Sequence, residues 1–135
     1  MKAKREIEKI AKSLEKNNNV IFAFAYGSSS KGRMHKFSDI DIAVRLKDAS
    51  LNAYFQLLSS LPETEREIDL RIIDELPPLL RLKIVREGSL LFTKDWKRLE
   101  EFISKTLIEA LEIKDQIERL KRKSIGEYLA DRDDN

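Results

Sequence analysis

Two aspartates one residue apart, Asp39 and Asp41, form the pattern in this chain that points most directly to chemistry. Asp41 lies within Ile40 to Leu46 ("IDIAVRL"), an apolar run whose length and composition predict a strand. Residues i and i+2 of a strand point to the same face, so the two carboxylates project together while Ile40 and Ile42 face the core. Two carboxylates this close repel each other, and a bound divalent cation removes that repulsion. The pair therefore predicts a metal site built from oxygen ligands.

A third aspartate, Asp69, lies in Glu67 to Ile73 ("EIDLRII"), whose strict alternation predicts another strand. If this strand pairs beside the one that carries Asp41, Asp69 joins the same site. The plainer interpretation is a strand residue whose carboxylate pairs with Arg71 or Arg45. The sequence leaves both arrangements open.

A glycine-serine step, Gly27-Ser28, follows the apolar run Val20 to Tyr26 ("VIFAFAY"), which we expect to be a strand buried on both faces. Glycine lets the backbone turn sharply and approach a ligand closely. The residues "SSSKG" after it are expected to open a short helix, whose free N–H groups form an anion site, and the Ser28 hydroxyl adds a donor. This step predicts a phosphate cradle beside the carboxylates, although such a step is also found in simple turns.

The composition narrows the chemistry further. The chain has no cysteine, which excludes a disulfide framework, a thiolate zinc site and a cysteine nucleophile. It has a single histidine, His35, which argues against a histidine metal cluster and a Ser-His-Asp triad. A metal here must be held by carboxylates, which favours magnesium, with manganese as the alternative. A phosphate cradle beside carboxylate-bound magnesium is the machinery of phosphoryl or nucleotidyl transfer.

The charge balance bears on partners and location. Charged residues make up 37% of the chain, yet the net charge is only +2, so direct nucleic-acid binding is not expected. No stretch is long and apolar enough for a transmembrane span, and the N-terminal residues lack the apolar core of a signal peptide. We expect a soluble cytoplasmic protein without membrane association.

Helical and extended patterns alternate along the chain. The predicted helices cover residues 2–16, 51–61, 77–86 and about 95–123, and the predicted strands cover residues 20–26, 40–46, 67–73 and 89–93. This order predicts an α/β or mixed α+β fold, with a small mixed sheet of about four strands flanked by helices. We expect one domain over residues 1–124, which ends in the long helix, followed by a frayed tail at residues 125–135.

The motif residues also carry a family resemblance. Gly27-Ser28, then ten residues, then Asp39-x-Asp41 resembles the signature of the DNA polymerase β-like nucleotidyltransferase superfamily. The fuller run "YGSSSKGRMHKFSDIDIAV" is similar to the minimal nucleotidyltransferases of that superfamily, the MntA-type antitoxins. The resemblance covers nearly the whole chain, including the leading helix, the later acidic strand and the stretch "REGSLLFTKD" before the last helix.

This resemblance implies roles for the three aspartates. Asp39 and Asp41 would hold two magnesium ions that bridge the phosphates of a nucleoside triphosphate. Asp69 would complete the site and help to activate an acceptor hydroxyl, as a metal ligand or as a general base.

The same resemblance implies a phosphate-binding set. Gly27 and Ser28 would hold the terminal phosphates of the nucleotide. Arg33 is the weaker candidate in the basic stretch between the two halves of the motif, because it follows Gly32 as a basic or small residue does in the family.

For the MntA family the resemblance implies transfer of AMP from ATP to a tyrosine of a partner HEPN ribonuclease toxin, which silences the toxin. Two alternatives stay open. The chain could neutralise its partner by binding alone, or it could be a nucleotidyltransferase with a small-molecule acceptor such as an aminoglycoside.

The predicted last helix carries a long apolar stripe. Its members recur at spacings of three and four residues: Leu99, Phe102, Ile103, Leu107, Ala110, Leu111, Ile117 and Leu120. One interpretation is that the stripe covers the sheet. Because it is longer than a small sheet needs, its C-terminal half is also a candidate surface for a partner or for a homo-oligomer.

Overall fold

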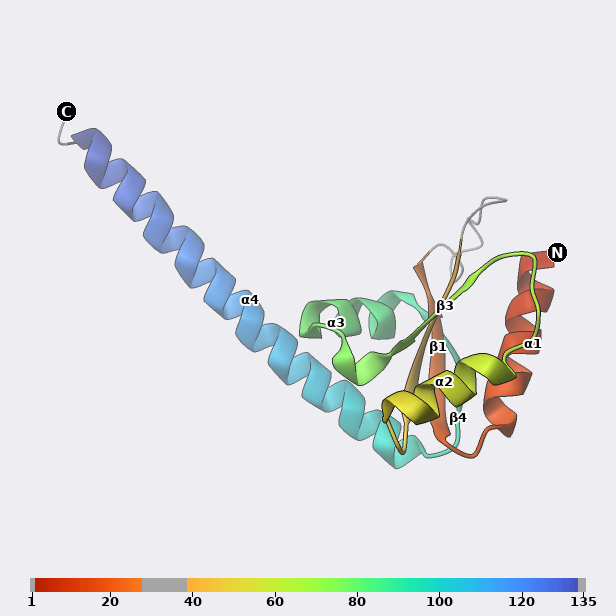
Figure 1. The fold of residues 1–135 in the computed structure, drawn as a ribbon. Coiled ribbons are helices and arrows are strands. Elements are labelled where there is room, and N and C mark those ends of the chain that lie inside the picture. Colours follow the sequence, from red (N-terminus) through yellow and green to blue (C-terminus); the bar gives the residue numbers. More distant parts are fainter. Residues whose placement is uncertain (1, 28–38, 134–135) are drawn as a thin grey trace.

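The structure, a computed structural model, describes residues 2–27 and 39–133 (Figure 1). The expected short helix after Gly27, the basic stretch, and the candidate residues Ser28 and Arg33 lie outside the described residues. The aspartates and Gly27 lie within them.

Within the described residues the predicted elements are present, with bounds that differ by at most one residue apart from the end of the last helix. The helices are α1 (Lys2–Lys16), α2 (Leu51–Ser60), α3 (Pro78–Glu87) and α4 (Trp96–Asp133), and a 3-10 helix, η2 (Ile73–Glu75), was not predicted. The strands are β1 (Val20–Tyr26), β2 (Ile40–Leu46), β3 (Ile68–Ile72) and β4 (Ser89–Thr93). Ser50 caps α2, because its side chain accepts a hydrogen bond from the Ala53 N–H.

The four strands form one mixed sheet in the order β3-β2-β1-β4, which confirms the predicted α/β fold class. Strand β1 pairs antiparallel with β2 and with β4, whereas β2 and β3 are parallel. A parallel pair needs a crossover connection, and α2 supplies it. Strand β3 therefore lies at one edge of the sheet, next to the strand that carries Asp41.

Apolar side chains are buried on both faces of the sheet, and β1 is buried on both sides as predicted. One core lies between the sheet and α1 and α2, with buried residues that include Ile10, Leu14, Ala25, Ile40, Ile42, Val44, Leu57 and Leu70. The other lies against α3 and the start of α4, with Phe22, Phe24, Ala43, Ile84, Leu99 and Phe102. Because both faces are covered, the sheet is a rigid support for the groups at its end.

A buried arginine joins α3 to α4. Arg81 donates to the Leu76 carbonyl oxygen at 3.0 Å and to the Thr106 hydroxyl at 3.4 Å, and its guanidinium also pairs with the Glu109 carboxylate. Hydrogen bonding to Arg81 lowers the pKa of Glu109. A buried cation is costly unless it is paired, so this network fixes how α4 leaves the body.

The last helix corrects the prediction. It continues to Asp133, so the expected end near residue 123 and the frayed tail from residue 125 were wrong over residues 124–133. That segment holds good helix formers and no proline, and Gly126 lowers helix propensity without ending the helix. The domain boundary at residue 124 stays a prediction.

None of the described helices has the length and the apolar character needed to span a membrane. The cytoplasmic location expected from the sequence stays a prediction.

Candidate functional site

Three polar side chains form a row across three neighbouring strands. Asp41 on β2 lies directly opposite Tyr26 on β1 and directly opposite Asp69 on β3. Register partners in a sheet point to the same face, so Asp69, Asp41 and Tyr26 lie side by side on it. We call these three residues the acidic row. The two acidic strands are thus neighbours in the sheet, an arrangement that the sequence had left open.

The environment of Asp41 reflects this crowding. Burial raises the pKa of Asp41, and the nearby charges of Asp69 and then Asp39 raise it further, while Arg71 opposes them. Asp39 is exposed just before β2 begins, and Asp41 is half-buried. The charges of Asp39 and Asp69 thus both act on Asp41 at the end of the sheet, and the spacing in the sequence predicted the effect of Asp39.

Gly27 is held tightly against Asp41. Its φ of +66° lies in the left-handed region, which other residues rarely adopt. A Cβ atom added to Gly27 would lie 2.5 Å from Asp41 Oδ2. Both observations explain why a glycine stands here, next to the central carboxylate of the row.

Arg71 forms an ion pair within the site. Its Nε lies 3.4 Å from both carboxylate oxygens of Asp69, so the plainer interpretation of Asp69 as an ion-paired strand residue is also realised. The other arginine considered, Arg45, lies 3.6 Å from Asp74 instead. Arg71 follows Asp69 by two residues, so strand alternation could have placed it on the same face.

Two tyrosines, Tyr26 within the row and Tyr54 near it, were not singled out from the sequence. Burial raises the pKa of Tyr26, and the charges of Asp41 and Asp69 raise it further. Burial likewise raises the pKa of Tyr54, whose hydroxyl donates to the Leu70 carbonyl oxygen at 2.6 Å. Tyr54 therefore covers part of the outer edge of β3. Its signal in the sequence was weak, because an aromatic residue in an amphipathic helix usually belongs to the core.

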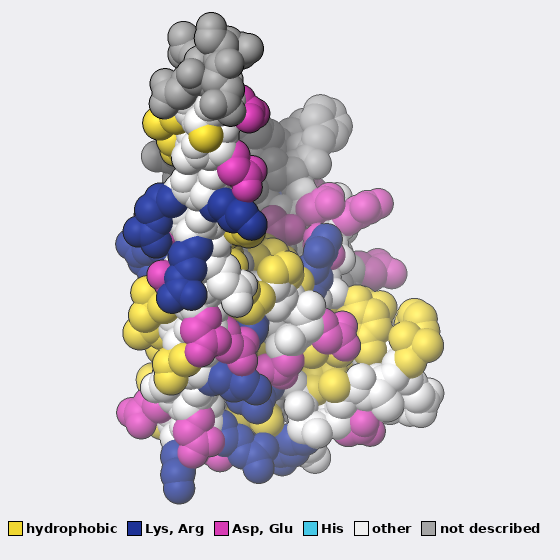
Figure 2. All heavy atoms as spheres, turned by 90° about the vertical axis from the view of Figure 1, so that its left-hand side faces the viewer, with side chains coloured by type: hydrophobic (Ala, Val, Ile, Leu, Met, Phe, Trp, Pro, Cys, Tyr) yellow, Lys and Arg dark blue, Asp and Glu magenta, His cyan; other side chains and the backbone are white. Residues whose placement is uncertain are grey.

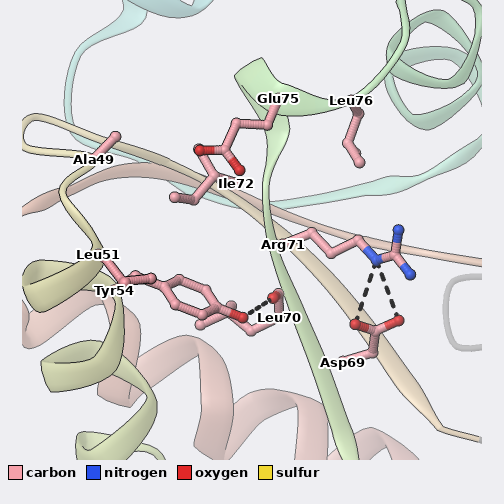
Figure 3. Close-up of a pocket in the computed structure, with 9 residues that line it drawn as sticks. All are labelled: Ala49, Leu51, Tyr54, Asp69, Leu70, Arg71, Ile72, Glu75 and Leu76. Carbon is pink, nitrogen blue, oxygen red and sulfur yellow. Dashed lines mark hydrogen bonds and ion pairs between the residues drawn. The ribbon is translucent and has the colours of Figure 1, made fainter.

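A cavity of about 650 Å³ opens beside the row, along the outer edge of β3 (Figure 3). Asp69 and Arg71 lie at one side of it, and Tyr54 and Glu75 come from α2 and η2. Its apolar lining comes from Ala49, Leu51, Leu70, Ile72 and Leu76. A cavity with apolar walls and a few charged groups at one end is typical of a binding site.

The donor chemistry of this site fits a hard divalent cation. The acidic row and Asp39 offer carboxylate oxygens, the ligands that magnesium and manganese prefer. In the described part of the chain, however, no three acidic side chains converge closely enough to form a ready metal site. In this structure the Asp69 carboxylate is ion-paired with Arg71.

Comparison with known families decides the chemical class. The profile of the family described as "Polymerase beta, Nucleotidyltransferase" matches residues 8–97, a stretch that includes every residue of the acidic row. The chain belongs to the polymerase beta nucleotidyltransferase family. The superfamily resemblance seen in the sequence is confirmed.

A curated relative, MJ1547 of Methanocaldococcus jannaschii, bears a name that assigns it protein adenylyltransferase activity. It is 31% identical over 77 residues, which are 57% of this chain and 59% of that protein. This chain therefore matches less than two thirds of the relative's length.

Solved structures of toxin–antitoxin complexes contain chains with a similar fold. A chain of a mutant MntA-HpeT toxin–antitoxin is 26% identical with a TM-score of 0.68, and the match covers 88% of this chain and 97% of that one. A toxin–antitoxin with AMP-PNP gives 23% identity and a TM-score of 0.65, with 90% and 97% covered. A complex of the tri-AMPylated HEPN toxin of Shewanella oneidensis with MNT antitoxin gives 22% and 0.65, with 91% and 98% covered. The last two establish a shared fold.

Proposed function

We propose that this chain is the antitoxin of a toxin–antitoxin pair and transfers AMP from ATP to a tyrosine hydroxyl of a HEPN toxin. The observation that carries the proposal is the acidic row, with Gly27 packed against its central carboxylate. Membership of the nucleotidyltransferase family supports the reaction class. The name of the Methanocaldococcus relative and the AMPylated toxin of the Shewanella complex support a protein acceptor, and the complex with AMP-PNP supports an adenine nucleotide.

The proposed roles follow the positions of the side chains. Asp39 and Asp41 would hold magnesium, with two ions expected and manganese as a substitute. Bound there, the metal would neutralise charge on the phosphates of ATP. Gly27 leaves room for a close approach of the triphosphate, and Ser28 and Arg33 are proposed as further phosphate contacts.

The reaction forms one bond and breaks one. The acceptor oxygen bonds to the α-phosphorus of ATP, the bond from that phosphorus to the bridging oxygen breaks, and pyrophosphate leaves. In this proposal Asp69 takes the proton of the acceptor hydroxyl. The cavity beside Asp69 offers the acceptor a path to the row, because its apolar walls suit a tyrosine ring and its charged end adjoins the carboxylate.

The test is an intact-mass assay of this chain with ATP, magnesium and the partner protein that co-purifies with it from its native host. We expect the partner to gain one or more AMP units, and the double variant Asp39→Asn, Asp41→Asn to add none. If the double variant still binds and neutralises its partner at matched expression, the chain masks the toxin and catalysis is not its function. If the partner gains no mass while ATP is consumed with a small hydroxyl compound, the acceptor assignment is wrong.

A further inference from the structure

The second half of α4 lies beyond the body of the protein (Figure 1). We call residues 111–133 the distal segment. The last fully buried side chain of α4 is that of Ala110. In the distal segment every side chain that the structure describes is exposed, apart from the half-buried Ile113. The segment is thus a helix without a core of its own to cover.

Large apolar side chains are nevertheless frequent there. Six of them are between 38% and 63% exposed: Leu111, Ile117, Leu120, Ile125, Tyr128 and Leu129. Proteins that act alone rarely expose a contiguous apolar patch larger than a few hundred Å². A helix that needed only to remain in solution would carry polar residues at these positions. Association with another surface explains their presence.

Two of these residues, Ile117 and Leu120, continue the stripe that packs against the body. Thr106 and Ala110 are buried, and Ile113, Ile117 and Leu120 follow at the same spacing of three and four residues. The face of α4 that contacts the protein's own core therefore runs on past the edge of that core. Its exposed continuation is the natural seam for a second helix.

Basic residues border this seam. Lys114 and Lys121 lie three residues before and four residues after Ile117, so they flank it on the same face. Four cations gather within five positions at Arg119, Lys121, Arg122 and Lys123. Figure 2 shows Lys and Arg side chains as a band across the projecting helix, with apolar side chains before and after it. Within this region, Arg119 pairs with Asp115 on the same helix at 3.0 Å.

This charge pattern disfavours a second copy of the chain as the occupant. Two parallel copies in register, or two antiparallel copies that overlap fully, place residues 119–123 of both copies against each other, and like charges at that distance repel. Sliding an antiparallel copy toward the body would bring the basic residues near Glu112 and Glu118. In that register the second copy would have to lie over Thr106 and Ala110. The protein's own core already covers these residues, so the register is blocked.

We propose that the distal segment docks one helix of a partner protein, an amphipathic helix whose apolar stripe is flanked by aspartate and glutamate. Such a helix would cover the seam at Ile117 and Leu120 and place its carboxylates near Lys114 and Lys121. Ile117, Leu120, Lys121, Ser124 and Ile125 already line a shallow groove that could receive its side chains. Identifying this partner with the toxin rests on the proposed function; the chemistry of the surface does not.

The test uses two synthetic amphipathic peptides of equal length with one leucine stripe, flanked by Glu in one and by Lys in the other. Binding to the full chain is measured by fluorescence anisotropy without ATP. We expect the Glu-flanked peptide to bind about tenfold tighter or more, and raised salt to narrow the difference. The double variant Ile117→Gln, Leu120→Gln should weaken its binding by about tenfold or more. The control variant Phe55→Gln, Ile108→Gln, which alters two exposed apolar side chains outside the distal segment, should bind as the parent does.

Other results would overturn the proposal. In the peptide assay, the proposal is wrong if the two peptides bind equally or if the double variant leaves binding unchanged. It is also wrong if sedimentation shows a dimer that the double variant abolishes. The same holds if the chain binds vesicles of phosphatidylcholine and phosphatidylglycerol more tightly than either peptide. Because the peptide assay needs neither nucleotide nor Asp39 and Asp41, its outcome is independent of AMP transfer. Peptide binding without AMP transfer would support the docking surface and contradict the proposed function. AMP transfer without peptide binding would support the proposed function and contradict the docking surface.

Discussion

The acidic row and the distal segment each contain an arrangement of side chains that does not favour stability. The two arrangements are opposite in kind. In the acidic row, like charges gather on a sheet whose two faces are packed. In the distal segment, apolar side chains lie in solvent on a helix that projects beyond the other described elements. Catalytic side chains must be held in fixed positions, and a packed sheet provides them. A docking surface must be accessible to a partner, and a projecting helix provides such a surface. The two tasks are therefore separable by mutation.

The largest expected effect comes from removing charge in the acidic row. The double variant Asp39→Asn, Asp41→Asn should lower AMP transfer by about a thousandfold or more, because the charge that would hold the metal is lost. Stability in metal-free buffer should stay equal or rise. A carboxyl whose pKa is raised on folding is destabilising once ionised, so the asparagine removes a penalty that is present at neutral pH. Intact mass and thermal unfolding with EDTA measure the two effects.

If this variant unfolds at a clearly lower temperature than the parent, the two carboxylates stabilise the fold. The acidic row would then not be a region that works against stability.

The next largest effect is expected where α4 still touches the body. Phe102 is buried, and its ring centroid lies 5.3 Å from that of Phe22. Phe102→Ala should therefore cost about 3–5 kcal/mol of unfolding free energy. Urea unfolding followed by circular dichroism measures the loss. A cost below about 1 kcal/mol would mean that α4 is not anchored through this residue.

The sequence predicted the strands well because each is a short apolar run bounded by polar or glycine residues. It could not fix that β2 and β3 are parallel, since this depends on the path of α2 across the sheet. It also ended the last helix near residue 123. Ser124 and Gly126 lower helix propensity by too little to stop a helix that continues into good helix formers.

An intermediate effect is expected at Gly27. Gly27→Ala should cost about 1–3 kcal/mol, because alanine is strained at a positive φ. The new methyl group would also lie 2.5 Å from Asp41 Oδ2, so the carboxylate must move. AMP transfer should fall further than stability explains. Comparing the transfer rate with the unfolding temperature separates the two effects. A fully active variant would show that Gly27 is not part of the site.

The site was foreseen only in part. Asp39 and Asp41 could be grouped because strand alternation places i and i+2 on one face, whereas Asp69 could join them only if its strand paired beside theirs. The pairing of Asp69 with Arg71 was one of two open choices, and only the position of each side chain decides between them. The buried Arg81 gave no signal, because an arginine on a helix is usually exposed and its partners on α4 are distant in the chain.

The smallest stability effect is expected in the distal segment, and it is the sharpest test of the comparison. Leu120 is 63% exposed in the folded chain, so folding removes little of its surface from water. Leu120→Ala should change the unfolding free energy by no more than about 0.5 kcal/mol, in contrast with Phe102→Ala on the same helix. A larger loss that grows with protein concentration would mean that a second copy already covers the seam. A larger loss at every concentration would place Leu120 against its own chain, and the distal segment would then be part of the core.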